Sequence, residues 1–147
     1  MHCHCFVRNG IVYIPTQGMM DKGLYRDIEP VAVVPLFNTE ALHRAFADTI
    51  ARGNPKVPIP RYPNIPPPDV LKYAGVKSWR AFARGTSTWA IAESDGAFAL
   101  HGYRKEGGGW VPDQSTRETF PPGTSADQVI DRLIAIMQEA AQRDQPR

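Results

Sequence analysis

The sequence predicts an α+β fold: an antiparallel sheet built from two hairpins plus one or two further strands, with two main helices packed on one face. Asn9-Gly10 and Asp95-Gly96 are preferred pairs for two-residue hairpin turns, and alternating apolar residues flank both. Two other segments, one in the first half of the chain and one near its end, carry apolar residues at helical spacing. With 147 residues the chain has the size of one ordinary domain, and we expect a single domain over residues 1–147.

The first hairpin is predicted over residues 2–15. A two-residue turn at Asn9-Gly10 opposes Arg8 to Ile11 and Val7 to Val12, which fixes which side chains share a face. His2 and His4 then project from one face. The other face is apolar and is expected to be buried; it carries Cys3, Cys5, Val7, Val12 and Ile14.

The string His2-Cys3-His4-Cys5 places four potential zinc or copper ligands in four successive residues. In a strand, however, successive side chains point to opposite faces, so the two histidines and the two cysteines cannot converge on one ion. Cys3 and Cys5 also lack the spacing of thiol oxidoreductases. We therefore expect neither a metal site nor a redox site here.

Residues 24–36 are predicted to form a third strand, and Pro30 and Pro35 favour an edge strand or a bulge. The first helix is predicted over residues 39–52, where Asn38 or Thr39 can cap the start and Gly53 can end it. Its apolar residues recur at helical spacing; they are Ala41, Leu42, Ala45, Phe46, Thr49 and Ile50.

A proline-rich connector follows this helix. Because residues 55–68 hold seven of the 14 prolines, the segment has few backbone donors and can be neither a helix nor a central strand. We expect an extended strap across the domain surface; a polyproline ligand for an aromatic groove is the alternative. A helical turn over residues 69–74 and a short helix over residues 78–84, ended by Gly85, come next.

The second hairpin turns at Asp95-Gly96 and opposes Trp89 to Gly102, which puts Trp89, Ile91, Phe98 and Leu100 on one face. Glycines 107–109 predict a turn, with short strands at residues 110–111 and 118–120. The last element is a helix that begins with a capping box made by Ser125 and Gln128. Its apolar stripe consists of Val129, Ile130, Leu133, Ile134, Met137, Ala140 and Ala141.

Composition excludes several classes of protein. Hydrophobic residues make up 42% and charged residues 22%, which is typical of globular chains and not of disordered or collagenous ones. No apolar stretch is long enough to span a bilayer. The N-terminal residues contain no uninterrupted apolar run of the kind found in signal peptides, so the sequence predicts a cytoplasmic protein.

Charge is distributed unevenly along the chain. Residues 52–84 hold seven basic residues and one acidic residue, although the whole chain has a net charge of only +2. Tyr62, Tyr73, Trp79 and Phe82 are interleaved with these bases, a composition that suits phosphates and stacked bases. A nucleic-acid-binding or nuclease-like protein that uses the basic segment 52–84 is therefore our alternative hypothesis, and Lys77, Arg80 and Arg84 are its candidate contacts.

The sequence contains no GxSxG, P-loop or dinucleotide-binding motif, and no helix with a lysine follows the glycines at 107–109. His43 and His101 are candidate acid–base residues, together with Lys72 or a carboxylate, but no sequence rule brings them together. We therefore expect a protein that is not an enzyme, with no catalytic residues and no cofactor.

Three strings resemble a group of small bacterial proteins, the immunity proteins of contact-dependent growth inhibition and related polymorphic-toxin systems. The strings lie between about residues 20 and 100: Leu24-Tyr25-Arg26-Asp27-Ile28-Glu29-Pro30, then Ala51-Arg52-Gly53-Asn54-Pro55 with Val57-Pro58, and Val70-Leu71-Lys72-Tyr73-Ala74-Gly75-Val76-Lys77-Ser78-Trp79. The resemblance implies a cytoplasmic, non-enzymatic protein that binds a cognate toxin domain, often a nuclease, and blocks its active site.

A basic nuclease groove would be met by carboxylates with an aromatic anchor. If the partner is such a toxin, the expected partner-binding residues lie in two places. They are Tyr25, Asp27 and Glu29 near the third strand, and Glu93 and Asp95 at the second hairpin turn.

Overall fold

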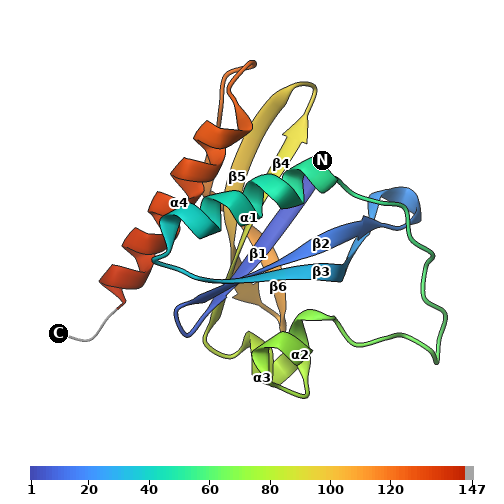
Figure 1. The fold of residues 1–147 in the computed structure, drawn as a ribbon. Coiled ribbons are helices and arrows are strands. Elements are labelled where there is room, and N and C mark those ends of the chain that lie inside the picture. Colours follow the sequence, from blue (N-terminus) through green and yellow to red (C-terminus); the bar gives the residue numbers. More distant parts are fainter. Residues whose placement is uncertain (145–147) are drawn as a thin grey trace.

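The computed structural model describes residues 1–144, and within them it confirms the α+β fold. Six strands form one antiparallel sheet in the order β3-β2-β1-β4-β5-β6 (Figure 1). The strands are β1 (His2–Arg8), β2 (Ile11–Met19), β3 (Tyr25–Pro35), β4 (Thr86–Ser94), β5 (Ala97–Glu106) and β6 (Gly109–Thr119). The helices are α1 (Thr39–Arg52), α2 (Val70–Ala74), α3 (Trp79–Ala83) and α4 (Ala126–Arg143), with a short 3-10 turn at Asp21–Gly23.

The two hairpins have the predicted turns and registers. In the first turn Asn9 and Gly10 have φ values of 52° and 76°, and in the second Asp95 and Gly96 have 54° and 77°, as a type I′ turn requires. Val7 pairs with Val12, and Trp89 pairs with Gly102, as expected. Strand β1 of the first hairpin joins the two hairpins into one sheet, because it pairs with β4 as well as with β2.

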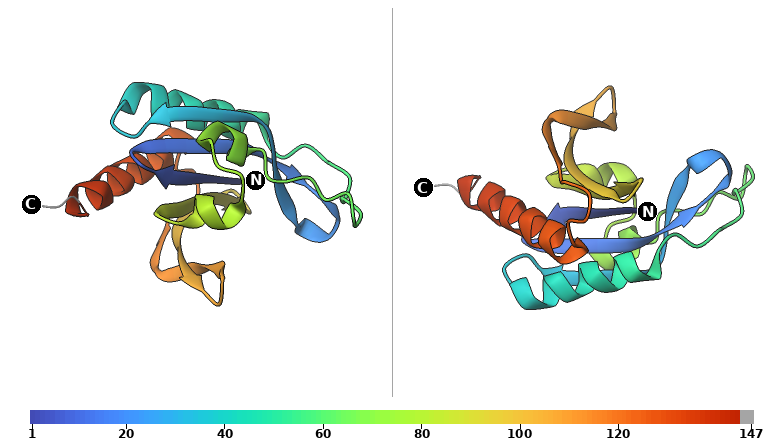
Figure 2. Two further views of the ribbon diagram at one scale, coloured as in Figure 1. Left: turned by 90° about the horizontal axis from the view of Figure 1, so that it is seen from below. Right: turned by 90° about the horizontal axis from the view of Figure 1, so that it is seen from above.

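Strand β3 is an edge strand, as its prolines predict. Its pairing with β2 shifts register between Pro15 and Thr16, opposite the stretch that contains Pro30. The register change absorbs the proline, which has no N–H to donate to the ladder. Beyond this bulge, the outer ends of β2 and β3 form an arm that extends away from β1 (Figure 2).

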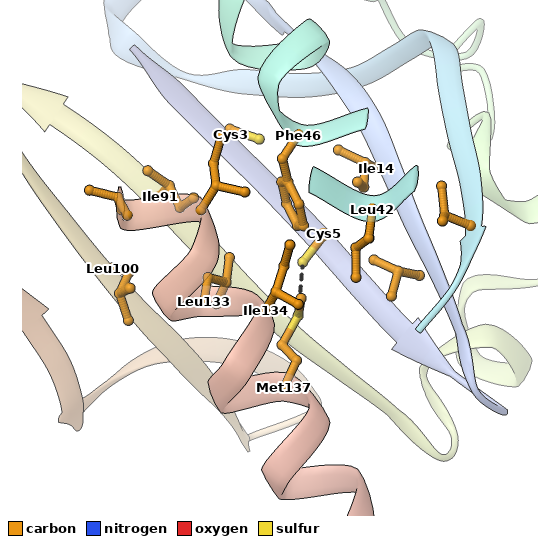
Figure 3. Packing of buried hydrophobic residues seen from close by; sticks show 14 of the residues in the cluster. Cys3, Cys5, Ile14, Leu42, Phe46, Ile91, Leu100, Leu133, Ile134 and Met137 are labelled. Atoms are coloured by element: carbon orange, nitrogen blue, oxygen red, sulfur yellow. Dashed lines mark hydrogen bonds between the residues drawn. The ribbon is translucent and has the colours of Figure 1, made fainter. Parts of the chain in front are cut away.

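The main core lies between the sheet and the two long helices, which pack side by side on one face (Figure 1). Cys3, Cys5, Val12 and Ile14 are buried there, and Val7 packs against them half-buried. Figure 3 shows the α1 side chains Leu42 and Phe46 and the α4 side chains Leu133, Ile134 and Met137 converging on the same strands.

The opposite face of the sheet is covered only in part, by α2 and α3. Phe82 of α3 is fully buried against Phe6 and Tyr13, with ring centroids 5.2 and 5.9 Å away. Val70 and Leu71 of α2 complete this second cluster. The two short helices were expected, but nothing in their sequence indicated on which face they would lie.

Strand β6 is longer than predicted. We expected two short strands, at residues 110–111 and 118–120, whereas the structure has one strand from Gly109 to Thr119 with a register shift opposite Leu100 and Gly102. Pro112 is tolerated because β6 is the other edge of the sheet. Within residues 1–144, no helix is both long and apolar enough to cross a membrane.

Candidate functional site

The proline-rich connector is anchored to the arm of β2 and β3. Pro55 accepts a hydrogen bond from the Met19 amide at 2.8 Å, and the Val57 amide donates to the Met19 carbonyl at 3.0 Å. Gly18 lets the connector approach closely, since a Cβ at this position would lie 2.8 Å from the Val57 side chain. The start of the connector is therefore fixed, and the rest must cross from the arm to α2.

The side chain of Asn54, just before the connector begins, hydrogen-bonds to both β1 and β2. Its side-chain oxygen accepts the His2 amide at 2.9 Å, and its side-chain nitrogen donates to the carbonyls of His2 at 2.7 Å and Gln17 at 3.0 Å. The amide thus bridges β1 and β2 where the two strands separate. The separation opens space on the face opposite α1 and α4.

A pocket of about 450 Å³ occupies this space. The connector, the arm and α3 form its walls, and β1 contributes to its floor. Most of the lining is apolar or aromatic; it comprises His4, Met20, Tyr25, Arg26, Asp27, Ile59, Pro60, Ile65, Pro66, Pro67, Pro68 and Trp79.

A polar network lies at the floor of the pocket. His4 Nε2 lies 2.6 Å from Asp27 Oδ1, and the Gln17 side-chain nitrogen donates to the same oxygen. The other end of the Gln17 amide accepts from His2 Nδ1 at 3.0 Å. Gln17 is only 3% exposed, and both ends of its amide are hydrogen-bonded, as a buried polar group requires. His4 of β1 and Gln17 of β2 together hold the Asp27 carboxylate in place.

His2 stacks on Tyr25, with ring centroids 4.8 Å apart. Burial lowers the pKa of His2, and the neighbouring His4 lowers it further. The hydrogen bond to Gln17 acts in the opposite direction and raises the pKa, but burial outweighs it; a neutral His2 with its proton on Nδ1 still donates to Gln17. The Tyr25 ring is thereby positioned at the side of the pocket.

The three predicted partner-binding residues on β3 lie in two different environments. Tyr25 and Asp27 line the pocket, and the Asp27 side chain is only 9% exposed. Glu29 lies outside the pocket, where it pairs with Lys72 and accepts hydrogen bonds from the Tyr73 hydroxyl at 2.7 and 2.9 Å. Lys72 first, and Tyr73 second, hold the pKa of Glu29 below its usual value. Glu29 thus attaches α2 to the edge strand.

The other two predicted residues, Glu93 and Asp95, are exposed at the turn between β4 and β5. They do not line the pocket. The turn nevertheless lies at the same end of the sheet, because His2 pairs with Ala92 of β4 and is joined to Gln17 of β2 through Asn54. The structure therefore places four of the predicted residues, Tyr25, Asp27, Glu93 and Asp95, towards one end of the sheet, leaves Glu29 against α2, and does not gather the five into one cluster.

The basic segment 52–84 does not form one uniform surface. Lys72 is paired with Glu29, and Arg52 donates to the Thr16 hydroxyl at 3.0 Å. Lys77, Arg80 and Arg84 are exposed around α3. The interleaved Trp79 is half-buried: it packs against Phe6 and Phe82 and also lines the pocket.

The candidate acid–base histidines lie on opposite faces of the sheet. His43 of α1 is held by two carboxylates of α4: Nδ1 lies 2.7 Å from Asp131 and Nε2 lies 3.0 Å from Asp127. His101 of β5 lies on the far face, where burial lowers its pKa and the charge of Arg117 adds to the effect. Among residues 1–144, no group of three or more His, Cys, Asp or Glu side chains is placed to hold a metal ion.

Sequence reasoning placed His4 on the correct face but missed its pairing with Asp27, and it missed Gln17 and Asn54 altogether. Gln17 and Asn54 are polar residues that lie where secondary-structure elements diverge. Their polarity is the only feature of the sequence that marks them as candidates. His4 lies on β1 and Asp27 on β3, with β2 between the two strands, so their contact depends on the register of β3. No two-residue turn precedes β3, and a bulge shifts its register.

Comparisons with known proteins support the fold alone. No protein-family model matches the sequence. None of the curated proteins matches it. A solved structure from Neisseria meningitidis, described as a protein of unknown function, is similar with a TM-score of 0.64 at 14% identity, over 93% of each chain.

Proposed function

We propose that this protein is a cytoplasmic immunity protein that binds a cognate bacterial toxin domain, a nuclease, and occludes its active site. The binding face is the end of the sheet around the connector pocket. The observation that carries the proposal is a concentration of exposed large apolar side chains here. Leu24, Ile59, Tyr62 and Ile65 are 60%, 51%, 89% and 62% exposed, respectively.

Two of these residues line the pocket, and the other two are their neighbours in the chain. Ile59 and Ile65 line the pocket, Tyr62 lies between them in the connector, and Leu24 directly precedes Tyr25 of the pocket wall. Exposed apolar groups that gather in this way mark interaction sites, because water contact with them is unfavourable unless a partner covers them. A connector stiffened by prolines presents them with little loss of conformational entropy on binding.

Both signs of charge occur at this end of the sheet. Asp27 and Arg26 line the pocket, Lys56 and Arg61 are exposed in the connector, and Glu93 and Asp95 are exposed on the β4–β5 turn. The carboxylates are the part of this surface that suits a basic partner. Carboxylates around an apolar centre favour association with a basic groove and raise the rate of encounter. The three strings that resemble immunity proteins lead to the same proposal independently.

The test has two stages. The immobilised protein is used to recover a stoichiometric partner from the native host, and the catalytic domain of that partner is then produced separately. Its activity is measured against increasing amounts of this protein. We expect the activity to be lost at a one-to-one ratio, since occlusion is stoichiometric. A partner whose activity persists at saturation contradicts the proposal.

Matched variants locate the binding face. Ile65→Ser together with Tyr62→Ser removes two exposed apolar groups from the connector and should weaken inhibition at least tenfold if they are central contacts. Phe37→Ser is the control, because Phe37 is also exposed, at 51%, but does not line the pocket. Equal loss in both variants would place the interface elsewhere.

The nucleic-acid hypothesis predicts a different result. In that case the purified protein binds RNA or DNA with an affinity that falls steeply with salt and is lost when Lys77, Arg80 and Arg84 become alanine. Submicromolar binding of this kind at physiological ionic strength, with no protein partner recovered, overturns the immunity proposal.

A further inference from the structure

We infer that the connector pocket receives an arginine side chain of the toxin domain, with its guanidinium group directed at Asp27. This inference rests on the proposed function and specifies the chemistry of its central contact. Three features of the pocket carry it: its flat apolar walls, the carboxylate at its floor, and its size.

The walls suit a planar cation on an apolar stem. Trp79 and Tyr25 contribute aromatic rings, and Pro66, Pro67 and Pro68 contribute flat apolar surface. A guanidinium stacks on such rings, and the three methylenes of arginine bury favourably against apolar walls. A volume of about 450 Å³ accommodates this side chain together with part of its backbone.

The floor supplies the matching charge. Oδ1 of Asp27 is occupied by His4 and Gln17. Among the side chains that the structure describes, none donates to Oδ2, although Asp27 lines the pocket. This oxygen is therefore available to accept a guanidinium N–H, and such charge-assisted bonds are about twice as strong as neutral ones.

Arg26 also lines the pocket, so removing its charge and removing that of Asp27 should change the binding of arginine in opposite directions. Its positive charge opposes a cationic occupant and favours an anionic one. Removing the charge should strengthen the binding of arginine, whereas removing the charge of Asp27 should weaken it. An anionic or neutral occupant would not respond in this way.

The probe is N-acetyl-arginine methylamide, and the control ligand is the citrulline counterpart, which has the same shape without the charge. Binding is followed by NMR through the Trp79 indole N–H and the ring signals of His4. We expect a dissociation constant on the order of millimolar, as for other ligands of this size. Citrulline should bind about tenfold more weakly, because the charge-assisted bond is lost.

Four variants complete the experiment. Asp27→Asn should weaken the binding of the arginine probe about tenfold, and Arg26→Gln should strengthen it a few-fold. Ile65→Lys and Ile65→Glu should shift the affinity in opposite directions, weaker and tighter, by charge alone. Because Ile65 is 62% exposed, these two variants remain informative if Asp27→Asn disturbs the fold. Glu139→Gln, at an exposed position of α4 that does not line the pocket, should leave the affinity unchanged.

Equal binding of arginine and citrulline, or tighter binding by Asp27→Asn, overturns the inference. A toxin complex whose affinity is insensitive to Asp27→Asn and to Ile65→Lys also overturns it, while the proposed function stands if inhibition persists. If no protein partner exists, the proposed function fails and the arginine contact fails with it, even where the free probe still binds.

Discussion

Asn54 and His2 form a two-way pair in which the Asn54 side chain accepts the His2 amide at 2.9 Å and donates to the His2 carbonyl at 2.7 Å. The side chain thus takes the place of a neighbouring strand at the point where β1 and β2 separate. It satisfies backbone groups that would otherwise be left without partners, and it positions the connector above the pocket.

Asn54→Ala should therefore lower the free energy of unfolding by about 1–3 kcal/mol, the cost of leaving partly buried backbone groups unpaired. Chemical denaturation measures the change. Asn64→Ala is the matched control, because Asn64 is exposed in the connector, and it should change the stability by less than about 0.5 kcal/mol. Similar values for the two variants would show that the bridge does not stabilise the fold.

The C-terminal helix is an integral part of the core. Ile134 is 2% exposed and packs in the cluster shown in Figure 3. Ile134→Ala should lower the free energy of unfolding by about 2–4 kcal/mol, through lost burial and a residual cavity. The exposed Ile65→Ala is the control and should have little effect. Removal of residues after Gly123 with no change in melting temperature would contradict a structural role for α4.

His43 couples the stability to pH. Partial burial lowers the pKa of His43, but the hydrogen bonds and charges of Asp131 and Asp127 outweigh this effect and raise the pKa above its ordinary value of 6.5. The stabilisation is fully present below pH 6.5, the unfolded value, and is lost as the pH rises through the folded pKa.

The test compares the wild type with the double variant Asp127→Asn, Asp131→Asn. The wild type should be more stable by about 0.2–1 kcal/mol at about pH 5.5, the range for exposed ion pairs, and the difference should shrink towards about pH 8.5. A difference that stays constant over this range would exclude a contribution from His43 titration. NMR titration of the His43 ring gives the pKa directly.

The two thiols should be unreactive in the folded protein. Burial raises the pKa of Cys3 to about 12 and raises that of Cys5 well above its usual value. Cys5 donates to Met137 Sδ at 3.7 Å within the core. A thiol-reactive disulfide reagent at neutral pH should modify neither cysteine until denaturant is added, when both react. Rapid modification of the native protein would show that the hairpin opens.

Local signals in the sequence were sufficient for the hairpins and the long helices. Asn9-Gly10 and Asp95-Gly96 each specify one tight turn, and a tight turn sets the register of both strands that flank it. The capping box at Ser125 and Gln128 marks the start of α4, and both of its hydrogen-bonded contacts are present. These features depend on residues close together in the chain, so they could be predicted.

The candidate site depends on residues far apart in the chain. Asp27 was predicted to be a partner-binding carboxylate, yet its side chain is only 9% exposed, because Gln17 of β2 and His4 of β1 lie against it. This contact requires the register of β3, which follows a bulge and no standard turn. The immunity interface that sequence reasoning placed on Tyr25, Asp27, Glu29, Glu93 and Asp95 therefore remains a prediction, now centred on the pocket.

By itself, the sequence determined the alternation that buries Cys3 and Cys5 on one face of β1 and leaves His2 and His4 on the other, because a strand has a period of two residues. It also determined that residues 55–68 form a connector, because proline excludes regular structure. Only the tertiary structure decided where the connector lies. Its path is set by the Asn54 bridge and by the absence of a side chain at Gly18, contacts between residues too distant in sequence for any local pattern to encode.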